Sequence, residues 1–126
     1  MRTLILSLFI VLSCLLAADV AGDYKGTWTG AATGEFRMSL TSGGNGEMSG
    51  NVVFTMGNDE VKTKVTSVKV DGNKLDMTYQ FDLQGTELQS KIVGELKGKS
   101  FEGAYKTTTV ADGSPVDEGT WKASAR

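Results

Sequence analysis

The sequence predicts an all-β fold, a single eight-stranded antiparallel up-and-down β-barrel closed by pairing of its first and last strands. The tripeptide Gly-Thr-Trp occurs at 26–28 and again at 119–121. Between the two copies, short stretches of alternating apolar and polar residues are separated by glycine-containing turns, which is typical of half-buried strands. Sixteen glycines and a single proline suit a chain with many tight turns. We therefore expect the two tripeptides to lie side by side, on the first and last strands.

The N-terminus has the pattern of an export signal. One positive charge precedes residues 4–16, which are nearly all apolar, and small residues follow, with cleavage expected near Ala18 or Ala21. The apolar stretch is too short to span a bilayer as a helix but has the length of a signal-peptide apolar region. We expect residues 1–21 to be removed and residues 22–126 to form a soluble domain that is periplasmic or secreted.

A second processing route competes with the first. Residues 11–14, Val-Leu-Ser-Cys, resemble a bacterial lipobox, in which Cys14 would carry a lipid anchor. The apolar residues 15–18 differ from the polar tether of a lipoprotein, so the sequence favours a discarded peptide in which Cys14 is a small apolar residue. Because Cys14 is the only cysteine, the folded domain has no disulfide bond and no thiol ligand.

The first four strands are expected at 24–29, 35–40, 47–56 and 61–70. In the fourth, the alternation slips near Ser67, which predicts a β-bulge. The residues predicted to face inward are Tyr24, Gly26, Trp28, Phe36, Met38, Leu40, Met48, Val52, Phe54 and Met56.

The last four strands are expected at 74–82, 87–96 and 101–106, with a final strand that contains 119–123. An Asp-Gly-Asn turn at 71–73 marks a hairpin before the most regular of these strands. Their predicted inward residues are Leu75, Met77, Tyr79, Phe81, Leu88, Ser90, Ile92, Gly94, Leu96, Phe101, Gly103, Tyr105, Gly119, Trp121 and Ala123.

Short turns make consecutive strands neighbours, and closure removes the unpaired edges and the bare apolar face of an open sheet. Eight is a strand number that natural barrels use. A two-sheet sandwich is the alternative, and it needs longer crossovers than the sequence offers.

A membrane barrel would need an apolar exterior. The predicted outer face is instead polar and carries Lys62, Lys64, Asp76, Gln80, Glu87, Lys91 and Glu95.

Gly26-Thr27-Trp28 on the first strand of such a meander resembles the calycin-like barrels, which include lipocalins, fatty-acid-binding proteins and avidins. The stretch from this motif through Phe36 to residues 48–50 is similar to the avidin opening. Gly30 and Gly34 stand where avidins carry Asn and Ser ligands of biotin, so biotin binding is not implied. The resemblance implies a mouth at the rim formed by the turns at 30–34, 57–60, 82–85 and 111–115.

The predicted domain has few residues of the types that support catalysis. The chain has no histidine, which excludes Ser-His-Asp and Cys-His arrangements and histidine zinc sites. Asp76, Glu87, Glu95 and Glu102 are predicted to face solvent, and the alternation places no Asp or Glu inside. Residues 58–60 and 117–118 are more typical of a turn and an exposed strand start than of a cation site. We therefore predict no catalytic residues, no metal and no cofactor; a carboxylate-based isomerase or cyclase is the least favoured hypothesis.

Two functions remain. The first is a non-enzymatic exported barrel that binds a small apolar molecule inside. The second is a packed structural or protein-interaction module of the cell envelope, with bulky side chains filling the interior. The interspersed, slightly acidic charge does not indicate a nucleic-acid partner. The residues predicted to line a ligand are Trp28, Phe36, Met38, Phe54, Met56, Met77, Tyr79, Phe81, Tyr105 and Trp121.

Overall fold

The computed structural model describes residues 20–43 and 47–126. Residues 1–19, with most of the predicted signal peptide and the lipobox cysteine, lie outside the described residues. The described part of the chain contains no helix with the length and hydropathy needed to cross a membrane. Its strands are β1 (Gly22–Thr29), β2 (Thr33–Ser42), β3 (Met48–Met56), β4 (Asp59–Lys62), β5 (Lys64–Asp71), β6 (Lys74–Leu83), β7 (Thr86–Lys97), β8 (Ser100–Thr109) and β9 (Pro115–Ala125).

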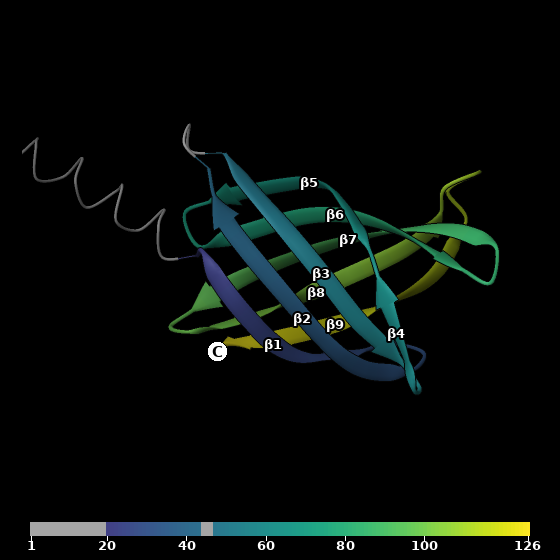
Figure 1. The fold of residues 1–126 in the computed structure, drawn as a ribbon, viewed down its shortest axis with the longest axis horizontal. Helices are drawn as coiled ribbons and strands as arrows, with labels where there is room; N and C mark the ends of the chain where they lie inside the picture. The colour runs from purple at the N-terminus through teal and green to yellow at the C-terminus, as the bar shows by residue number, and fades with distance from the viewer. Residues whose placement is uncertain (1–19, 44–46) are drawn as a thin grey trace, which may run out of the picture.

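The strands form one antiparallel sheet in the order β4-β3-β2-β1-β9-β8-β7-β6-β5, curled into a nearly closed barrel (Figure 1). The predicted pairing of the two Gly-Thr-Trp segments is confirmed, since Trp28 lies opposite Trp121 in the β1–β9 ladder. On its other side, each tryptophan has a glycine as its cross-strand partner. Trp28 pairs with Gly34 on β2, and Trp121 pairs with Gly103 on β8.

The prediction of eight strands in a closed barrel is wrong in two respects. The single strand expected at 61–70 is divided at Thr63, so that β4 pairs with β3 and β5 pairs with β6. The sheet therefore has two free edges, and β3 and β5 lie near each other without a ladder between them. The Thr63 hydroxyl donates a 2.7 Å hydrogen bond to the Val52 carbonyl, taking up an acceptor at this seam.

The bulge predicted in this region is confirmed. The β5–β6 register shifts between Val65 and Ser67, which leaves Thr66 as the extra residue. Because a bulge restores the inward direction of the next apolar side chain, it explains why Val68 and Val70 follow a different parity from Val65.

The inside and outside of the barrel agree with the predicted alternation. Lys62 and Glu87 are exposed, and the buried core consists of the inward side chains. The fully or nearly fully buried apolar residues are Val20, Tyr24, Trp28, Phe36, Met38, Leu40, Val52, Phe54, Leu75, Met77, Tyr79, Phe81, Leu88, Ile92, Phe101, Trp121 and Ala123.

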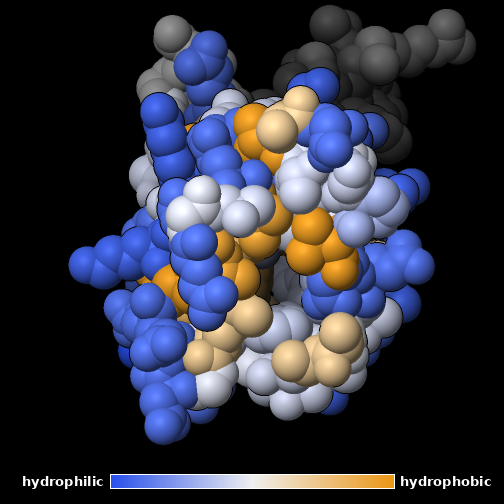
Figure 2. Space-filling model, turned by 90° about the vertical axis from the view of Figure 1, so that its right-hand side faces the viewer, coloured by the Kyte–Doolittle hydropathy of each residue, from blue (hydrophilic) through white to orange (hydrophobic). Residues whose placement is uncertain are grey.

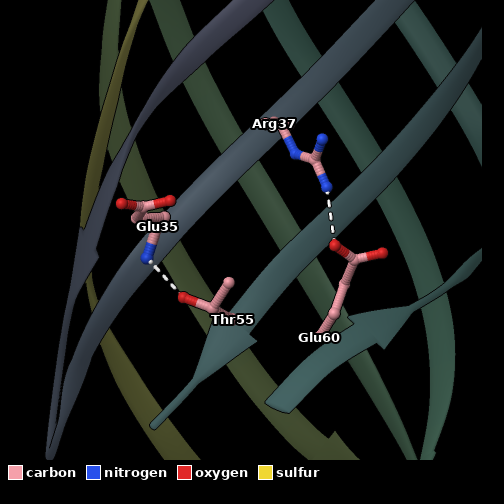
Figure 3. Close-up of polar contacts among 4 residues, drawn as sticks. All are labelled: Glu35, Arg37, Thr55 and Glu60. Atoms are coloured by element: carbon pink, nitrogen blue, oxygen red, sulfur yellow. Dashed lines mark hydrogen bonds and ion pairs between the residues drawn. The ribbon is translucent and has the colours of Figure 1, made fainter. Parts of the chain in front are cut away.

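Polar contacts on the outer face attach the short edge strand to the sheet. Arg37 on β2 reaches across β3 to Glu60 on β4, with 2.8 Å between Nη2 and Oε2 (Figure 3). On the neighbouring strand pair, the Glu35 amide donates to the Thr55 hydroxyl at 2.9 Å. An exposed ion pair contributes about 0–1 kcal/mol, so the Arg37–Glu60 pair orients β4 more than it stabilises the fold.

Candidate ligand-binding cavity

One end of the barrel is hollow. This open rim is formed by the turns at 30–32, 57–58, 84–85 and 110–114, on the right in Figure 1. A cavity of about 80 Å³ lies behind it, and Figure 2 shows this end hollowed between apolar side chains. Its lining residues are Trp28, Phe36, Phe54, Met56, Tyr79, Phe81, Leu83, Leu88, Ser90, Ile92, Tyr105, Thr107, Val116, Asp117 and Trp121.

The opposite end of the barrel is filled. Tyr24 and Phe101 pack edge to face there with ring centroids 4.9 Å apart. The Met77 side chain extends toward β3, where a Cβ added to Gly50 would lie 2.9 Å from its methyl carbon. Bulky side chains therefore close this half of the interior.

The cavity brings together eight of the ten residues predicted to line a ligand, Trp28, Phe36, Phe54, Met56, Tyr79, Phe81, Tyr105 and Trp121. The other two, Met38 and Met77, are fully buried and do not line it. Strand alternation identifies which side chains point inward, but it does not show at which height along the barrel the interior is filled. A ligand role for the eight stays a prediction.

Aromatic rings form a continuous wall around much of the cavity. Trp28 meets both Tyr105 and Phe54 edge to face, at centroid distances of 6.1 and 6.0 Å. Phe54 in turn packs edge to face on Phe81 at 5.0 Å, and Phe81 lies beside Tyr79. Edge-to-face pairs stabilise one another beyond simple burial, so this wall is preorganised rather than adaptable.

Both indole N–H groups are satisfied by backbone carbonyls. Trp28 Nε1 donates to the Thr55 carbonyl at 3.2 Å, and Trp121 Nε1 lies 3.1 and 3.2 Å from the carbonyls of Val93 and Ala104. These bonds fix the indole planes, and they leave no indole donor free for a ligand.

A buried polar pair lies within the apolar wall. The hydroxyl groups of Ser90 and Thr107 are 2.6 Å apart, on adjacent strands, and both residues are buried. The sequence predicts Ser90 to face inward but not Thr107, because the strand expected at 101–106 extends to Thr109. Burial raises the pKa of the nearby Tyr79 hydroxyl to about 12, with hydrogen bonding to Ser90 acting in the opposite direction. These groups are therefore neutral at physiological pH.

A carboxylate stands at the mouth of the cavity, contrary to the prediction that no Asp or Glu faces inward. Asp117 is half-buried and lines the cavity. Its Oδ2 accepts a 2.7 Å hydrogen bond from the Tyr105 hydroxyl, and its Oδ1 accepts a 3.0 Å bond from the Ala31 amide. Burial, followed by the bond to Asp117, raises the pKa of Tyr105 well above its usual range. The phenol is therefore held as a donor to the carboxylate.

Two local features place Asp117 there. Asp117 pairs with the inward-facing Thr107 on β8, and the register shift beside it leaves Val116 without a partner and brings this side chain to the cavity as well. Gly30 leaves the space, since a Cβ there would collide with the Tyr105 hydroxyl and lie 2.6 Å from Asp117 Oδ2. The sequence carried a signal for Asp117: the inward parity of Trp121 and Gly119 continues to position 117. Asp117 was not predicted to face inward because the last strand begins at Pro115, earlier than expected.

The cavity carries a single formal charge. Asp117 is its only acidic lining residue, and no Lys or Arg lines it. Neither ion pair in the described part of the chain, Arg37–Glu60 or Lys91–Asp76, involves Asp117. The same residues contain no group of three or more acidic, histidine or cysteine side chains that could hold a metal ion. The site is therefore a cavity with apolar walls and one fixed negative charge, that of Asp117, at the lip of its open rim.

Comparisons of the chain with protein-family models, with curated proteins and with solved structures found no match. The function is therefore inferred from the geometry of the cavity and from the sequence pattern.

Proposed function

We propose that this protein is an exported, non-enzymatic barrel that binds the apolar part of a small molecule in its hollow end. The observation that carries the proposal is a cavity lined by aromatic and aliphatic groups behind an open rim, in a barrel whose other half is filled. Concave, mostly apolar sites with a few placed polar groups are the usual form of small-molecule sites. The calycin-like resemblance suggested by the sequence would imply a mouth at the same rim, in agreement with this proposal.

The size of the cavity limits what enters it. Its volume of about 80 Å³ is smaller than the engineered cavity of about 150 Å³ that encloses benzene in another protein. A single ring or a short branched chain would therefore enter with its far end still at the open rim. We expect a ligand with one small apolar end rather than a long acyl chain.

The polar groups favour binding over catalysis. Tyr105 and the Ala31 amide both donate to Asp117, and Ser90 and Thr107 satisfy each other. Each buried polar side chain thus has its partner, as expected where rigidity rather than proton transfer is needed. Among the described residues, no buried side-chain polar atom lacks a hydrogen-bond partner.

Binding of 2-phenylethanol, a neutral single-ring probe, tests the proposal by tryptophan fluorescence and calorimetry. Leu88→Phe introduces a larger side chain at the cavity wall and should weaken binding at least fivefold. Val93→Phe is the matched control, because Val93 is on the same strand, 45% exposed, and lies outside the cavity lining. Saturable binding that Val93→Phe preserves and Leu88→Phe weakens supports the proposal. Binding unaffected by Leu88→Phe, or no binding of any single-ring probe, contradicts it and favours a packed interaction module.

Export is proposed on the N-terminal sequence pattern. Mass spectrometry of the protein purified from its native host tests it: a mature chain lacking the first 18 to 21 residues is expected. A diacylglyceryl mass on Cys14 would instead indicate the lipoprotein route.

A further inference from the structure

The mouth of the cavity combines an apolar entrance with a single anionic group. We propose that the ligand is an amphipathic amine, with an apolar ring or short chain inside the barrel and a protonated amine paired with the Asp117 carboxylate. This inference depends on the proposed function, and it specifies the chemical class of molecule that the cavity takes.

The Asp117 carboxylate is held in place by two hydrogen bonds but can still accept further hydrogen bonds from a ligand. Asp117 Oδ2 accepts from Tyr105 and Oδ1 from the Ala31 amide. An ionised carboxylate has about four lone-pair positions, so each oxygen can accept a further bond from a ligand. Because two donors, one on β8 and one in the turn between β1 and β2, fix its orientation, the carboxylate needs little rearrangement to bind a cation.

The charge of Asp117 has no counter-ion in the described part of the chain. Neither ion pair found there includes it, and the cavity lining has no Lys or Arg. A charge beside an apolar wall is less well solvated than one on an open surface, so a complementary charge is favoured there. The same field disfavours carboxylate ligands such as fatty acids.

The aromatic wall adds to this preference. The Tyr105 hydroxyl donates to Asp117, and its ring packs edge to face against Trp28. Alkylammonium groups are attracted to the faces of Tyr and Trp rings. An amine at the lip would thus meet a carboxylate on one side and aromatic surface on the other.

Three probes with the same ring and different head groups test the proposal: 2-phenylethylamine, 2-phenylethanol and 3-phenylpropionate. The wild-type chain should bind the amine about three- to fivefold more tightly than the alcohol at pH 7, and the carboxylate more weakly than either. Asp117→Asn should remove the preference for the amine and leave the affinity for the alcohol within about twofold. Its amide oxygen can still accept from the Ala31 amide, and the Tyr105 hydroxyl can accept from its NH₂, so the loop contacts are retained.

Glu118→Gln is the matched control, because it removes the same charge from the adjacent, exposed residue. It should leave the amine preference unchanged. Equal binding of amine and carboxylate by the wild-type chain overturns the proposal, as does an amine preference that survives Asp117→Asn or is lost in Glu118→Gln. If the alcohol binds in these cases, the proposed function stands without the amine. If none of the three probes binds, both fail.

Discussion

Trp28 and Trp121 face each other across the β1–β9 ladder, and their indoles diverge from there in opposite directions along the sheet. Trp28 reaches over β2 to the Thr55 carbonyl on β3, while Trp121 reaches over β8 to the Val93 carbonyl on β7. Each indole lies over glycine, Gly34 on one side and Gly94 on the other. The repeated Gly-Thr-Trp segments thus link six neighbouring strands, β3 to β7 through β2, β1, β9 and β8, and both tryptophans line the cavity.

Gly34→Ala should destabilise the barrel by about 1–3 kcal/mol. A Cβ at this position would collide with the Thr55 carbonyl and lie 2.5 Å from Trp28 Nε1, so the indole would have to move. Thr33→Ala, at the adjacent exposed position, is the control and should have little effect. Urea denaturation measures both, and equal stability of the two variants would show that the indole is not tightly packed.

Removing one hydroxyl of the Ser90–Thr107 pair should cost more than removing both. Ser90→Ala leaves the Thr107 hydroxyl buried without its partner, at a cost of about 1–3 kcal/mol. Ser90→Ala combined with Thr107→Val should recover at least half of that loss. A double-mutant cycle by chemical denaturation gives the coupling energy, and additive effects would contradict the structure.

Thr63→Val should loosen the seam. The substitution preserves shape but removes the 2.7 Å bond to the Val52 carbonyl, which costs about 1 kcal/mol. Amide hydrogen exchange should increase in β3, β4 and β5 more than in β7 and β8. Thr29→Val, on the exposed face of β1, is the control; uniform exchange changes across the sheet would count against a local role for Thr63.

Stability should fall at alkaline pH. Burial raises the pKa of Tyr79 to about 12, and burial with the bond to Asp117 raises that of Tyr105 further. Since the unfolded phenols ionise near pH 10, this stability is fully present below pH 10 and is lost as pH rises toward and beyond 12. Urea denaturation at pH 8, 10 and 11 measures the loss. Tyr105→Phe should lose less stability over this range than the wild-type chain, because it lacks one of the two phenols with a raised pKa.

The site of signal cleavage should matter for stability. Val20 is 1% exposed, and its carbonyl accepts a 2.8 Å hydrogen bond from the buried Tyr24 hydroxyl. A chain that begins after Ala18 keeps both contacts, whereas one that begins after Ala21 loses them, at about 2 kcal/mol. Thermal denaturation of the two recombinant chains measures the difference. Equal melting temperatures would show that Val20 is dispensable.

Much of the fold was predictable because strand alternation is a local property. The inward positions of Phe36 and Tyr79 and the bulge near Ser67 follow from the order of apolar and polar residues. The division of the fourth strand at Thr63 was not predictable, since a change of neighbouring strand leaves the alternation nearly intact. The inward direction of Asp117 follows from the same alternation, but the last strand was expected to start later than Pro115, where it begins.

The sequence by itself determined the class of fold, the pairing of the two tryptophan segments and the buried side of each strand, because these depend on a repeat of two residues and on matching ends. Only the tertiary structure decided that the barrel is left unsealed at one seam, filled at one end and hollow at the other. Those features depend on how side chains from distant strands, such as Met77 and Trp28, share the interior volume, and on which carbonyls and glycines they meet there. The same three-dimensional packing brings Asp117 to the lip of the cavity.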